Sequence, residues 1–259
     1  MTQKKRLKSI LSYLSDHQEV TVDEACVIFA VSPATIRRDF NRLAQEQRVT
    51  KTWGGIRLSL PTENRPNGLS VAARGTRFLA EKKRIARQAA SLIRENDVII
   101  IDGGTTTSEM TPLIANMRIK IITNSVLIAH QIHHTARGKG GAEVIMAGGL
   151  LYPSGALTVG PQAIDNLRAY YANIAFLSVG GISEIGATNS NILVVETERQ
   201  MIEQSERVVV LADRSKFGKQ DLVRLCDFDK IQTVITDDQL HAPALVDHLE
   251  SKGTRVVLA

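Results

Sequence analysis

Two short stretches of this 259-residue sequence combine glycines and polar side chains at spacings that suit ligand binding. The first reads DGGTTT and consists of Asp102, Gly103, Gly104, Thr105, Thr106 and Thr107. It follows the apolar run VIII and opens a predicted helix, so its glycines let the backbone approach a ligand while amides and hydroxyls point toward that ligand. No Gly-Lys-Ser/Thr sequence follows, so ATP and GTP are not expected. The stretch therefore predicts a ligand site of another kind at the end of a strand.

The second stretch reads SPATIRRDFNRL and joins a helix start to a group of arginines. Ser32 and Pro33 predict the start, because serine caps free amides and proline has no N–H to lose at the first helical position. Ile36, Phe40 and Leu43 recur at helical spacing and predict a buried face, which leaves the arginines outward. Arginine can bind a guanine edge through two hydrogen bonds, and threonine and alanine can contact a thymine methyl group. The helix is therefore predicted to enter the major groove of DNA.

DNA contacts are predicted on this helix and on the hairpin after it. Thr35 and Arg38 are expected to read bases, and Arg37 and Arg42 to hold phosphates or flanking bases. The predicted contacts are Ser32, Ala34, Thr35, Arg37, Arg38, Arg42, Lys51, Trp53 and Arg57. The alternative is a protein-interaction module whose paired arginines only face solvent. In that alternative Asp39 pairs with a neighbouring arginine, and Trp53 packs on the hairpin.

The recognition helix is expected to belong to a winged helix-turn-helix domain in residues 1–60. Residues 4–16 predict one amphipathic helix. Thr21 and Glu24 form a capping box for a second helix, which is expected to bury Ala25, Ile28 and Phe29. Two β-prone runs at 49–58 flank paired glycines, which are expected to supply the positive φ angles of a tight hairpin. Of the chain's net charge of +5, this region carries +4, which suits a nucleic-acid partner.

After a linker predicted at 61–77, rich in Pro, Asn and Gly, the pattern changes to short apolar runs that alternate with amphipathic segments. Strands are predicted at 98–101, 119–123, 143–147, 174–179, 207–212, 233–236 and 255–258. Helices are predicted at 81–94, 108–115, 126–133, 161–171 and 193–206. This alternation predicts an α/β effector-binding domain at 78–259, with a mostly parallel sheet covered on both faces.

Polar loops follow several of these strands, and parallel strands bring such loops to one edge of the sheet. Lys216 offers a point charge for a phosphate group. Besides the DGGTTT residues, the predicted effector-binding residues are Thr123, Asn124, Ser125, Gly148, Gly149, Gly180, Gly181 and Lys216. The alternative is structural, because glycine pairs after strands often only make turns and threonines at helix starts often only cap.

These motifs together resemble the DeoR family of bacterial sugar-metabolism regulators. The resemblance rests on VSPATIRRDFNRL with TWGGI, and on DGGTTT, TNS, VGP, ADRSKFG and ITDD in that order. It implies a sensor domain similar in fold to ribose-5-phosphate isomerase and glucosamine-6-phosphate deaminase, with a pocket for a sugar phosphate. Residues 187–198 depart from the family pattern, which has a Glu-Ala pair near Val194, so the resemblance gives Glu196 no clear role.

The expected function is a transcriptional regulator, a repressor of a carbohydrate-utilisation operon controlled by a phosphorylated sugar. The expected partners are operator DNA, a phosphorylated sugar or related metabolite, and further copies of the chain, as a dimer or larger homo-oligomer. The alternative is an isomerase or deaminase with a DNA-binding module, but the loop at 180–184 offers only Glu184 as an acid. His130, His133 and His134 are expected on a helix surface.

Metal and cofactor sites are not expected from the sequence. Cys26 and Cys226 lie far apart without a histidine pair, so we expect free, buried thiols and no zinc site. No signal-peptide or membrane-spanning run is found, so a cytoplasmic protein with no membrane partner is expected. The sequence does not identify the sugar, the operon, or whether the ligand releases or promotes DNA binding.

Overall fold

The fold is described from a computed structural model of residues 1–259. The described residues are 3–17, 19–45, 49–52, 54–58, 71–136 and 140–259. Within these ranges the side chains of Lys4, Ser15, Asp16, Thr50, Arg57, Leu58 and 71–73 are not described. The chain divides into two compact units, Met1–Gly68 and Leu69–Ala259. We call them the N-terminal and C-terminal units and describe each by itself.

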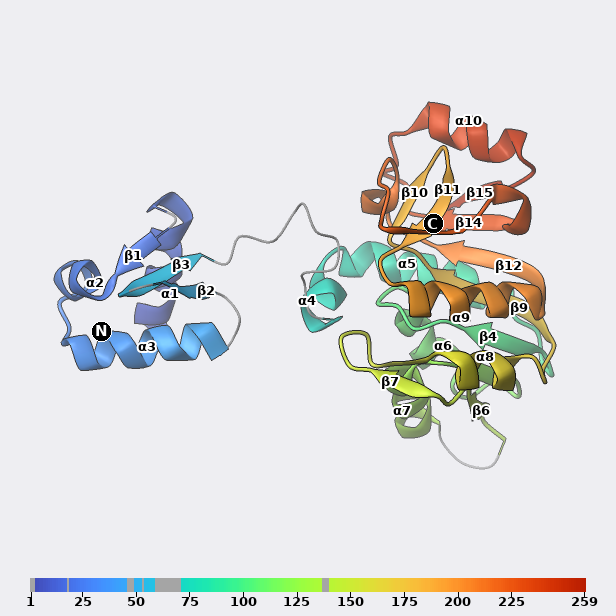
Figure 1. Cartoon of the computed structure of the whole chain (residues 1–259), viewed down its shortest axis with the longest axis horizontal. Helices are drawn as coiled ribbons and strands as arrows, with labels where there is room; N and C mark the ends of the chain where they lie inside the picture. The colour runs from blue at the N-terminus through green and yellow to red at the C-terminus, as the bar shows by residue number, and fades with distance from the viewer. Residues whose placement is uncertain (1–2, 18, 46–48, 53, 59–70, 137–139) are drawn as a thin grey trace. The chain divides into compact units, whose positions relative to one another are not determined.

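The N-terminal unit contains the three predicted helices and the predicted hairpin (Figure 1). Its elements are α1 (Gln3–His17), β1 (Glu19–Thr21), α2 (Val22–Phe29), α3 (Pro33–Gln45), β2 (Val49–Thr52) and β3 (Gly55–Leu58). Strand β1 was not predicted. It pairs antiparallel with β3 and completes a sheet of order β1-β3-β2. The unit has the winged helix-turn-helix arrangement that the sequence predicts.

Helix α2 begins as predicted but buries a different face. The capping box is present, with Glu24 N donating to Thr21 Oγ1 at 3.3 Å and Thr21 N donating to Glu24 Oε2 at 2.8 Å. Ile28 is 42% exposed, so its prediction as a buried residue is wrong. The residues of α2 that pack on the core are Val22, Ala25, Cys26 and Phe29. Ile28 falls outside this i, i+3, i+4, i+7 spacing.

The two glycines of the hairpin have different reasons to be glycine. Gly54 has a φ of +88°, in the region that favours glycine, as the turn prediction requires. Gly55 does not have a positive φ. A Cβ atom at Gly55 would lie 2.3 Å from the backbone oxygen of Val20, so this glycine lets β3 approach β1. The paired-glycine prediction is correct for Gly54 and wrong for Gly55.

Helix α3 packs on the core through the predicted residues and one buried ion pair. Ile36, Phe40 and Leu43 are at most 4% exposed, as predicted. Asp39 is fully buried, and its carboxylate accepts from Arg6 Nε at 2.5 Å. The expectation that Asp39 pairs with an arginine is confirmed, and the partner, Arg6, lies on α1 rather than on the same helix. The pair fixes α3 against α1, so the opposite face of α3 points outward.

All seven predicted strands of the C-terminal unit are present in one sheet. They are β4 (Val98–Ile101), β5 (Lys120–Thr123), β6 (Glu143–Met146), β9 (Ala172–Ser178), β12 (Ser205–Leu211), β14 (Thr233–Thr236) and β15 (Arg255–Leu258). Their order is β15-β14-β12-β9-β4-β5-β6, and every neighbouring pair is parallel. From β4 the chain builds outward through β5 and β6, then returns to place β9 on the other side of β4. The strand order therefore reverses between β4 and β9.

Helices cover both faces of this sheet, as predicted (Figure 1). One face carries α5 (Leu79–Ala90), the 3-10 turn η1 (Thr107–Met110), α6 (Thr111–Ile114) and α7 (Val126–Thr135). The other carries α8 (Pro161–Leu167), α9 (Ile192–Glu203) and α10 (Pro243–Ser251). Alternation along β4 divides the two cores, because Ile99 and Ile101 join the first and Ile100 joins the second.

Several elements of this unit were not predicted. They are the helices α4 (Val71–Thr76) and α10, the hairpin strands β7 (Leu150–Tyr152) and β8 (Leu157–Val159), and a small sheet of β10 (Gly181–Ser183), β11 (Gly186–Asn189) and β13 (Val223–Cys226). The short turns η2 (Arg214–Lys216) and η3 (Phe228–Lys230) complete the unit. Helix α4 lies inside the predicted linker, whose residues 61–70 fall outside the described part of the chain.

No described helix has the length and apolar content to cross a bilayer. No group of three or more His, Cys, Asp or Glu in the described part of the chain lies close enough to hold a metal ion. Cys26 and Cys226 are free and only partly buried.

Asp39→Ala is expected to destabilise the N-terminal unit by about 3 kcal/mol, because it leaves the Arg6 charge buried without its partner. The double variant Arg6→Met/Asp39→Leu should recover most of that loss, since no buried charge remains. Fluorescence of Trp53, the chain's single tryptophan, during urea denaturation measures unfolding of this unit. A midpoint for Asp39→Ala equal to that of the unmodified chain would contradict the expectation.

Candidate nucleic-acid interface and ligand site

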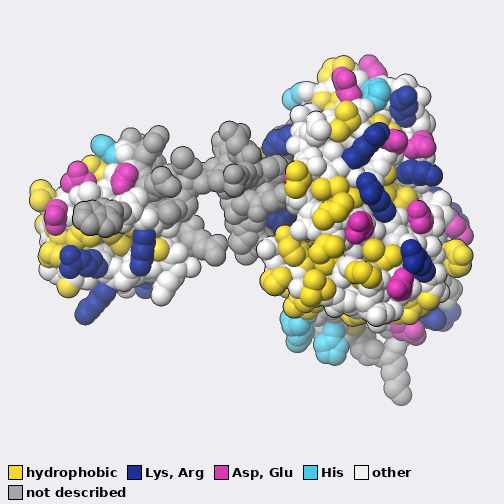
Figure 2. Space-filling view, in the orientation of Figure 1, with side chains coloured by type: hydrophobic (Ala, Val, Ile, Leu, Met, Phe, Trp, Pro, Cys, Tyr) yellow, Lys and Arg dark blue, Asp and Glu magenta, His cyan; other side chains and the backbone are white. Residues whose placement is uncertain are grey.

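The outward face of α3 presents the predicted DNA-reading residues. Arg37 and Arg38 are exposed, and the described residues offer neither an ion pair nor a hydrogen bond to either one. Figure 2 shows Lys and Arg side chains projecting from the part of the N-terminal unit where α3 lies. Ser32 Oγ accepts from Thr35 N at 3.4 Å and lies 3.0 Å from Thr35 Oγ1, so these two side chains cap the helix. Ala34 is exposed beside them.

The remaining predicted DNA contacts differ in their surroundings. Arg42 is exposed, but its Nη1 donates to Gln3 Oε1 at 3.2 Å, so part of its guanidinium group contacts α1. Lys51 is exposed on β2. Trp53 and the side chain of Arg57 lie outside the described residues. The exposed cations of α3 and β2 therefore give this unit a basic surface that suits duplex DNA.

A cavity of about 210 Å³ lies at the carboxyl edge of the large sheet, beside the loop after β4. Its lining includes the predicted residues Gly103, Gly104, Thr105 and Ser125. The remaining lining residues are Arg74, Gly75, Ser108, Glu109, Leu127, Gln131 and Gly155. Open α/β sheets bind ligands at the carboxyl edge where the strand order reverses, and β4 lies at that point here. The cavity is smaller than the roughly 300–1,000 Å³ of drug-sized sites, so it suits a small metabolite.

The glycines of the β4 loop allow close packing rather than unusual backbone angles. A Cβ atom at Gly103 would lie 2.0 Å from Leu157 Cδ2, and one at Gly104 would lie 2.1 Å from Ser178 Oγ. Neither glycine has a positive φ. The loop therefore follows a path that only glycine allows at these two positions, and this path forms one wall of the cavity.

Asp102 lies beneath this loop and joins the ends of three strands. It is 1% exposed, and its Oδ2 accepts from Ser178 Oγ at 3.0 Å, while Asn124 Nδ2 lies 3.4 Å from its Oδ1. Asn124 Oδ1 in turn accepts from Gly103 N at 3.1 Å. Burial raises the pKa of Asp102, and the hydrogen bonds from Ser178 act in the opposite direction. Asp102 is thus a supporting residue of the loop.

Glu198 is a second buried carboxyl group near Asp102 and was not predicted from the sequence. It is fully buried on α9, and Asn189 Nδ2 donates to its Oε1 at 2.7 Å. Burial, and then the charge of Asp102, raise the pKa of Glu198 well above its ordinary value. Glu196 is exposed, so the buried acid of the segment that departs from the family pattern is Glu198.

Among the threonines of the two polar loops, Thr105 lines the cavity, whereas the hydroxyl groups of Thr107 and Thr123 form hydrogen bonds with the backbone. Thr107 Oγ1 donates to Asp102 O at 2.7 Å and accepts from Gly104 N at 2.8 Å. Thr123 Oγ1 donates to Ile101 O at 2.6 Å. Thr106 is buried, and Thr105 lines the cavity. The prediction that all three hydroxyls of DGGTTT point toward a ligand is therefore wrong for Thr107.

Cations gather beside the cavity in a partly buried environment. Lys82 is 3% exposed, and its Nζ donates to Arg74 O at 2.5 Å. Burial lowers the pKa of Lys82 to about 8; Asp213 opposes this, while Lys216 and Arg74 add to it. Burial also lowers the pKa of Lys216 and of Arg74. Lys82, Lys216 and Arg74 are cations close enough to repel one another, and an anion bound nearby would relieve this repulsion.

Other predicted ligand residues reach the same edge of the sheet but do not line this cavity. A Cβ atom at Gly149 would meet Val159 O, and one at Gly180 would meet the side chain of Asp221. Gly148 and Gly181 are likewise packed against Asn166 and Lys219. Lys216 lies on η2, within the electrostatic range of Arg74 but outside the lining.

The sequence prediction missed seven of the residues that line the cavity. Arg74 and Gly75 lie on α4, in the segment that was predicted as a linker without regular structure. Gly155 comes from the unpredicted β7–β8 hairpin. Ser108 and Glu109 directly follow DGGTTT, so the helix start predicted there was a signal that could have included them.

The groups considered for an enzyme do not form a catalytic arrangement. Glu184 is exposed, and the carboxyl groups of Asp102 and Glu198 are buried below the cavity loop. His130, His133 and His134 are exposed on α7, as predicted. A general base must reach the proton that it removes, and Glu184, Asp102 and Glu198 do not line the cavity, whose one acidic lining residue is Glu109.

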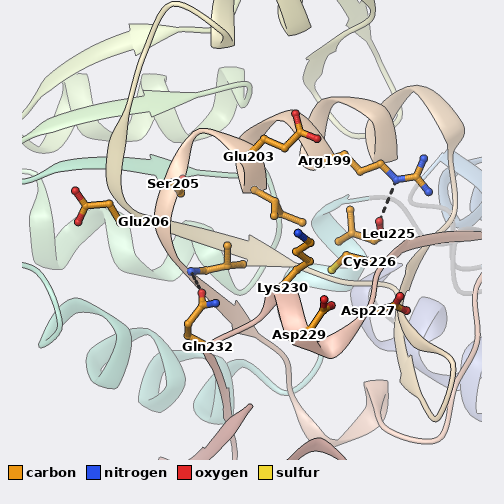
Figure 3. A pocket seen from close by; sticks show the side chains of 12 residues that line it. Arg199, Glu203, Ser205, Glu206, Leu225, Cys226, Asp227, Asp229, Lys230 and Gln232 are labelled. Atoms are coloured by element: carbon orange, nitrogen blue, oxygen red, sulfur yellow. Dashed lines mark hydrogen bonds between the residues drawn. The ribbon is translucent and has the colours of Figure 1, made fainter. Parts of the chain in front are cut away.

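A second cavity, of about 700 Å³, lies near the C-terminal end of α9 and the start of β12 (Figure 3). Arg199 Nε donates to Leu225 O at 3.0 Å, and Val208 N donates to Gln232 Oε1 at 2.7 Å. Its charged lining residues are Arg199, Lys230, Glu203, Glu206, Asp227 and Asp229. These groups carry both signs, and Arg199 and Asp227 contact β13, so we assign this cavity no ligand.

Both units match models of one protein family. Residues 6–62 match a DeoR-like helix-turn-helix domain, and residues 77–238 match the DeoR C-terminal sensor domain. The C-terminal match alone covers more than half of the chain.

The similar proteins include transcriptional regulators, and these matches extend over nearly the whole length of both chains. The chain is 32% identical to the transcriptional repressor GlcR of Bacillus subtilis, over 100% of this chain and 97% of that protein. It is 31% identical to the regulator IolR of Bacillus subtilis, over 91% of each. It is 30% identical to the glycerol-3-phosphate regulon repressor of Escherichia coli, over 92% of each.

Solved structures similar to this chain include a D-ribose-5-phosphate isomerase in complex with phospho-erythronic acid. That likeness has a TM-score of 0.39 and 14% identity, and it covers 52% of each chain. A translation initiation factor eIF-2B from Pyrococcus horikoshii covers 90% of this chain and 94% of its own, with a TM-score of 0.45 and 15% identity. Both TM-scores are low, so no functional conclusion rests on these structures.

Replacing Arg37 or Arg38 with alanine should weaken binding to a preferred DNA site by about 1–3 kcal/mol where the side chain reads a base. Where it contacts a phosphate, the slope of log affinity against log salt should fall by about one. Fluorescence anisotropy with labelled duplexes across a salt series distinguishes these outcomes. Arg87→Ala, an exposed arginine on α5, is the matched control and should leave affinity unchanged. Unchanged affinity in a folded Arg37→Ala/Arg38→Ala variant would exclude α3 as the reading helix.

The lowered pKa of Lys82 predicts a rise of stability with pH. Below pH 8 the amine is charged in both folded and unfolded chains, and above about 10.5 it is neutral in both. Between these values the unfolded chain binds more protons, so the free energy of unfolding should rise by up to about 3 kcal/mol. Lys82→Met removes this titration.

The measurement is the difference in free energy of unfolding between the unmodified chain and Lys82→Met, from denaturant curves at a series of pH values. Lys83→Met, at an exposed neighbour, is the control and should give no such slope. A flat difference for Lys82→Met between pH 8 and 10.5 would show that Lys82 keeps an ordinary pKa.

Proposed function

The chain belongs to the DeoR family of helix-turn-helix transcriptional regulators, and on that premise we propose that it represses a carbohydrate-utilisation operon under the control of a phosphorylated sugar. The prediction of a DNA-binding regulator rather than an enzyme is confirmed, since both units match models of a regulator family and the similar proteins are regulators. The ligand, the operon and the residues that bind them belong to the proposal.

The cavity at the reversal of strand order is the observation that carries the ligand proposal. Its lining combines hydroxyl groups of Thr105, Ser108 and Ser125 with the acid Glu109 and the amide Gln131, which can bind the hydroxyls of a sugar. Arg74, Lys82 and Lys216 make its surroundings positive, which favours a phosphate group. One similar protein is named for glycerol 3-phosphate, a phosphorylated polyol.

The DNA-binding assembly is proposed to contain at least two copies of the chain. A single winged helix reads only a short half-site, so specific operators are bound by dimers or larger oligomers. Exposed Leu150, Leu151 and Tyr171, between 53% and 80% exposed, offer apolar surface for such contacts. Figure 2 shows apolar side chains gathered on the face of the C-terminal unit where α9 and β7 lie. A regulator of this kind acts where the chromosome is, which places it in the cytoplasm.

The proposal is tested by measuring binding to DNA from the region upstream of the protein's own gene, with and without a panel of sugar phosphates. We expect one sugar phosphate to change operator affinity by about 5–150-fold, which corresponds to a coupling free energy of roughly 1–3 kcal/mol. The same compound should stabilise the chain by about 2.7 kcal/mol at 100 times its dissociation constant. If no sugar phosphate changes either quantity, the proposed ligand class is wrong.

Ser108→Tyr places a bulky side chain in the cavity and should abolish both effects without loss of operator binding. Ser91→Tyr is the matched control, because Ser91 is exposed at the C-terminal end of α5 and does not line the cavity. A full response to the sugar phosphate in Ser108→Tyr would place the ligand elsewhere.

A further inference from the structure

Helix α4 contributes Arg74 and Gly75 to the cavity and is the first helix of the C-terminal unit. The N-terminal unit ends at Gly68, and α4 begins at Val71. A ligand that contacts the β4 loop in this cavity therefore also contacts the first helix after the DNA-binding unit. No other helix of the C-terminal unit stands in this position in the chain.

Arg74 has an unsatisfied group in this wall of the cavity. Its Nε atom is buried, and none of the described residues accepts a hydrogen bond from it. A guanidinium group keeps its charge at any ordinary pH, and a buried charged donor without an acceptor is unfavourable. Burial lowers the pKa of Arg74, opposed by the charges of Tyr152 and Asp102, so the group lies in a poorly solvated position. An oxyanion ligand would supply the missing acceptor.

The backbone of Arg74 and the chain that follows it are linked to the same edge of the sheet. Arg74 O accepts from the buried Nζ of Lys82 on α5. Farther along, Arg214 Nη1 contacts Glu81 at 3.2 Å and Asp237 at 2.7 Å, and its guanidinium lies 4.8 Å from the ring centre of Phe78. The start of α5 is thus held by loops that follow β12 and β14. Within this frame, the Nε atom of Arg74 has no hydrogen-bond acceptor among the described residues.

We propose that Arg74 binds the phosphate of the effector and that α4 carries ligand occupancy toward the DNA-binding unit. The proposal rests on the proposed function, because it concerns the same cavity. A phosphate oxygen accepts from the Arg74 guanidinium group, and the β4 loop and Ser108 contact the rest of the ligand. Occupancy then holds α4, the first helix after the N-terminal unit, on the rest of the C-terminal unit. Arg74 is a binding residue and also the link between the two activities.

Two measurements distinguish a binding role of Arg74 from a purely structural role: the affinity for the ligand and the affinity for the operator without ligand. A structural role would change both affinities together. Arg74→Gln keeps the side-chain length and some donors but removes the charge, so ligand affinity should fall at least tenfold. Operator affinity without ligand should stay within about twofold of the unmodified chain, because Arg74 lies outside the N-terminal unit. The operator response to the active sugar phosphate should be lost.

The first test uses inorganic phosphate as the probe on the full chain. Phosphate should raise the melting temperature and slow hydrogen exchange of the amides at 71–76 in the unmodified protein. Both effects should be lost in Arg74→Gln and kept in part in Arg74→Lys, which retains a point charge. Arg77→Gln is the matched control, because Arg77 is exposed and lies beside the ring of Phe78. Circular dichroism establishes that each variant is folded.

The outcomes distinguish this inference from the proposed function. If Ser108→Tyr loses phosphate binding while Arg74→Gln keeps it, the cavity is the ligand site and the inference about Arg74 is overturned. If phosphate binds through Arg74 but exchange at 71–76 does not change, the role of α4 in coupling is overturned. If neither phosphate nor any sugar phosphate affects the unmodified chain, both proposals fail. Should Arg74→Gln not fold, Arg74→Lys with the same readouts decides the question.

Discussion

The buried carboxyl group of Asp102 is the interaction on which the ligand site depends. Two neighbouring strand ends reach it, through Ser178 at the end of β9 and Asn124 directly after β5. Asn124 also fixes the amide of Gly103, so the path of the β4 loop follows from the position of one carboxyl group. Glu198 lies close by, and two buried carboxyls cannot both ionise at low cost. Asp102 accepts more hydrogen bonds, which favours its charged form and leaves the proton on Glu198.

A corresponding constraint orients the recognition helix. The pair between Arg6 and Asp39 lies on the inner side of α3, among the apolar residues that pack on α1. Buried pairs of this kind contribute little net stability, but they tolerate few alternative arrangements. With Asp39 turned inward, Arg37 and Arg38 have no acid on their own helix within the described contacts and remain outward. The basic surface is therefore a consequence of where one acid is buried.

Sequence periodicity predicted the parts of the fold that depend on local pattern. The seven parallel strands, the capping box and the buried face of α3 all follow from alternation or helical spacing within a few residues. It could not show contacts between distant segments. Whether Glu196 or Glu198 is buried depends on what packs against α9, and whether Gly55 must be glycine depends on β1. Arg74 was missed for the same reason, because composition alone made its segment look like a linker.

Separation of DNA reading from ligand sensing sets an energetic condition on any link between them. Coupling between two sites requires only a few kcal/mol of differential affinity, and a ligand must interact differently with the two states to supply it. One charge-assisted hydrogen bond to a poorly solvated guanidinium contributes an amount of that order, roughly 1.5–3 kcal/mol. Contacts to the rigid β4 loop would be equal in both states and would add affinity without coupling. Arg74, on the first helix after the N-terminal unit, is therefore better placed than the β4 loop to convert ligand binding into regulation.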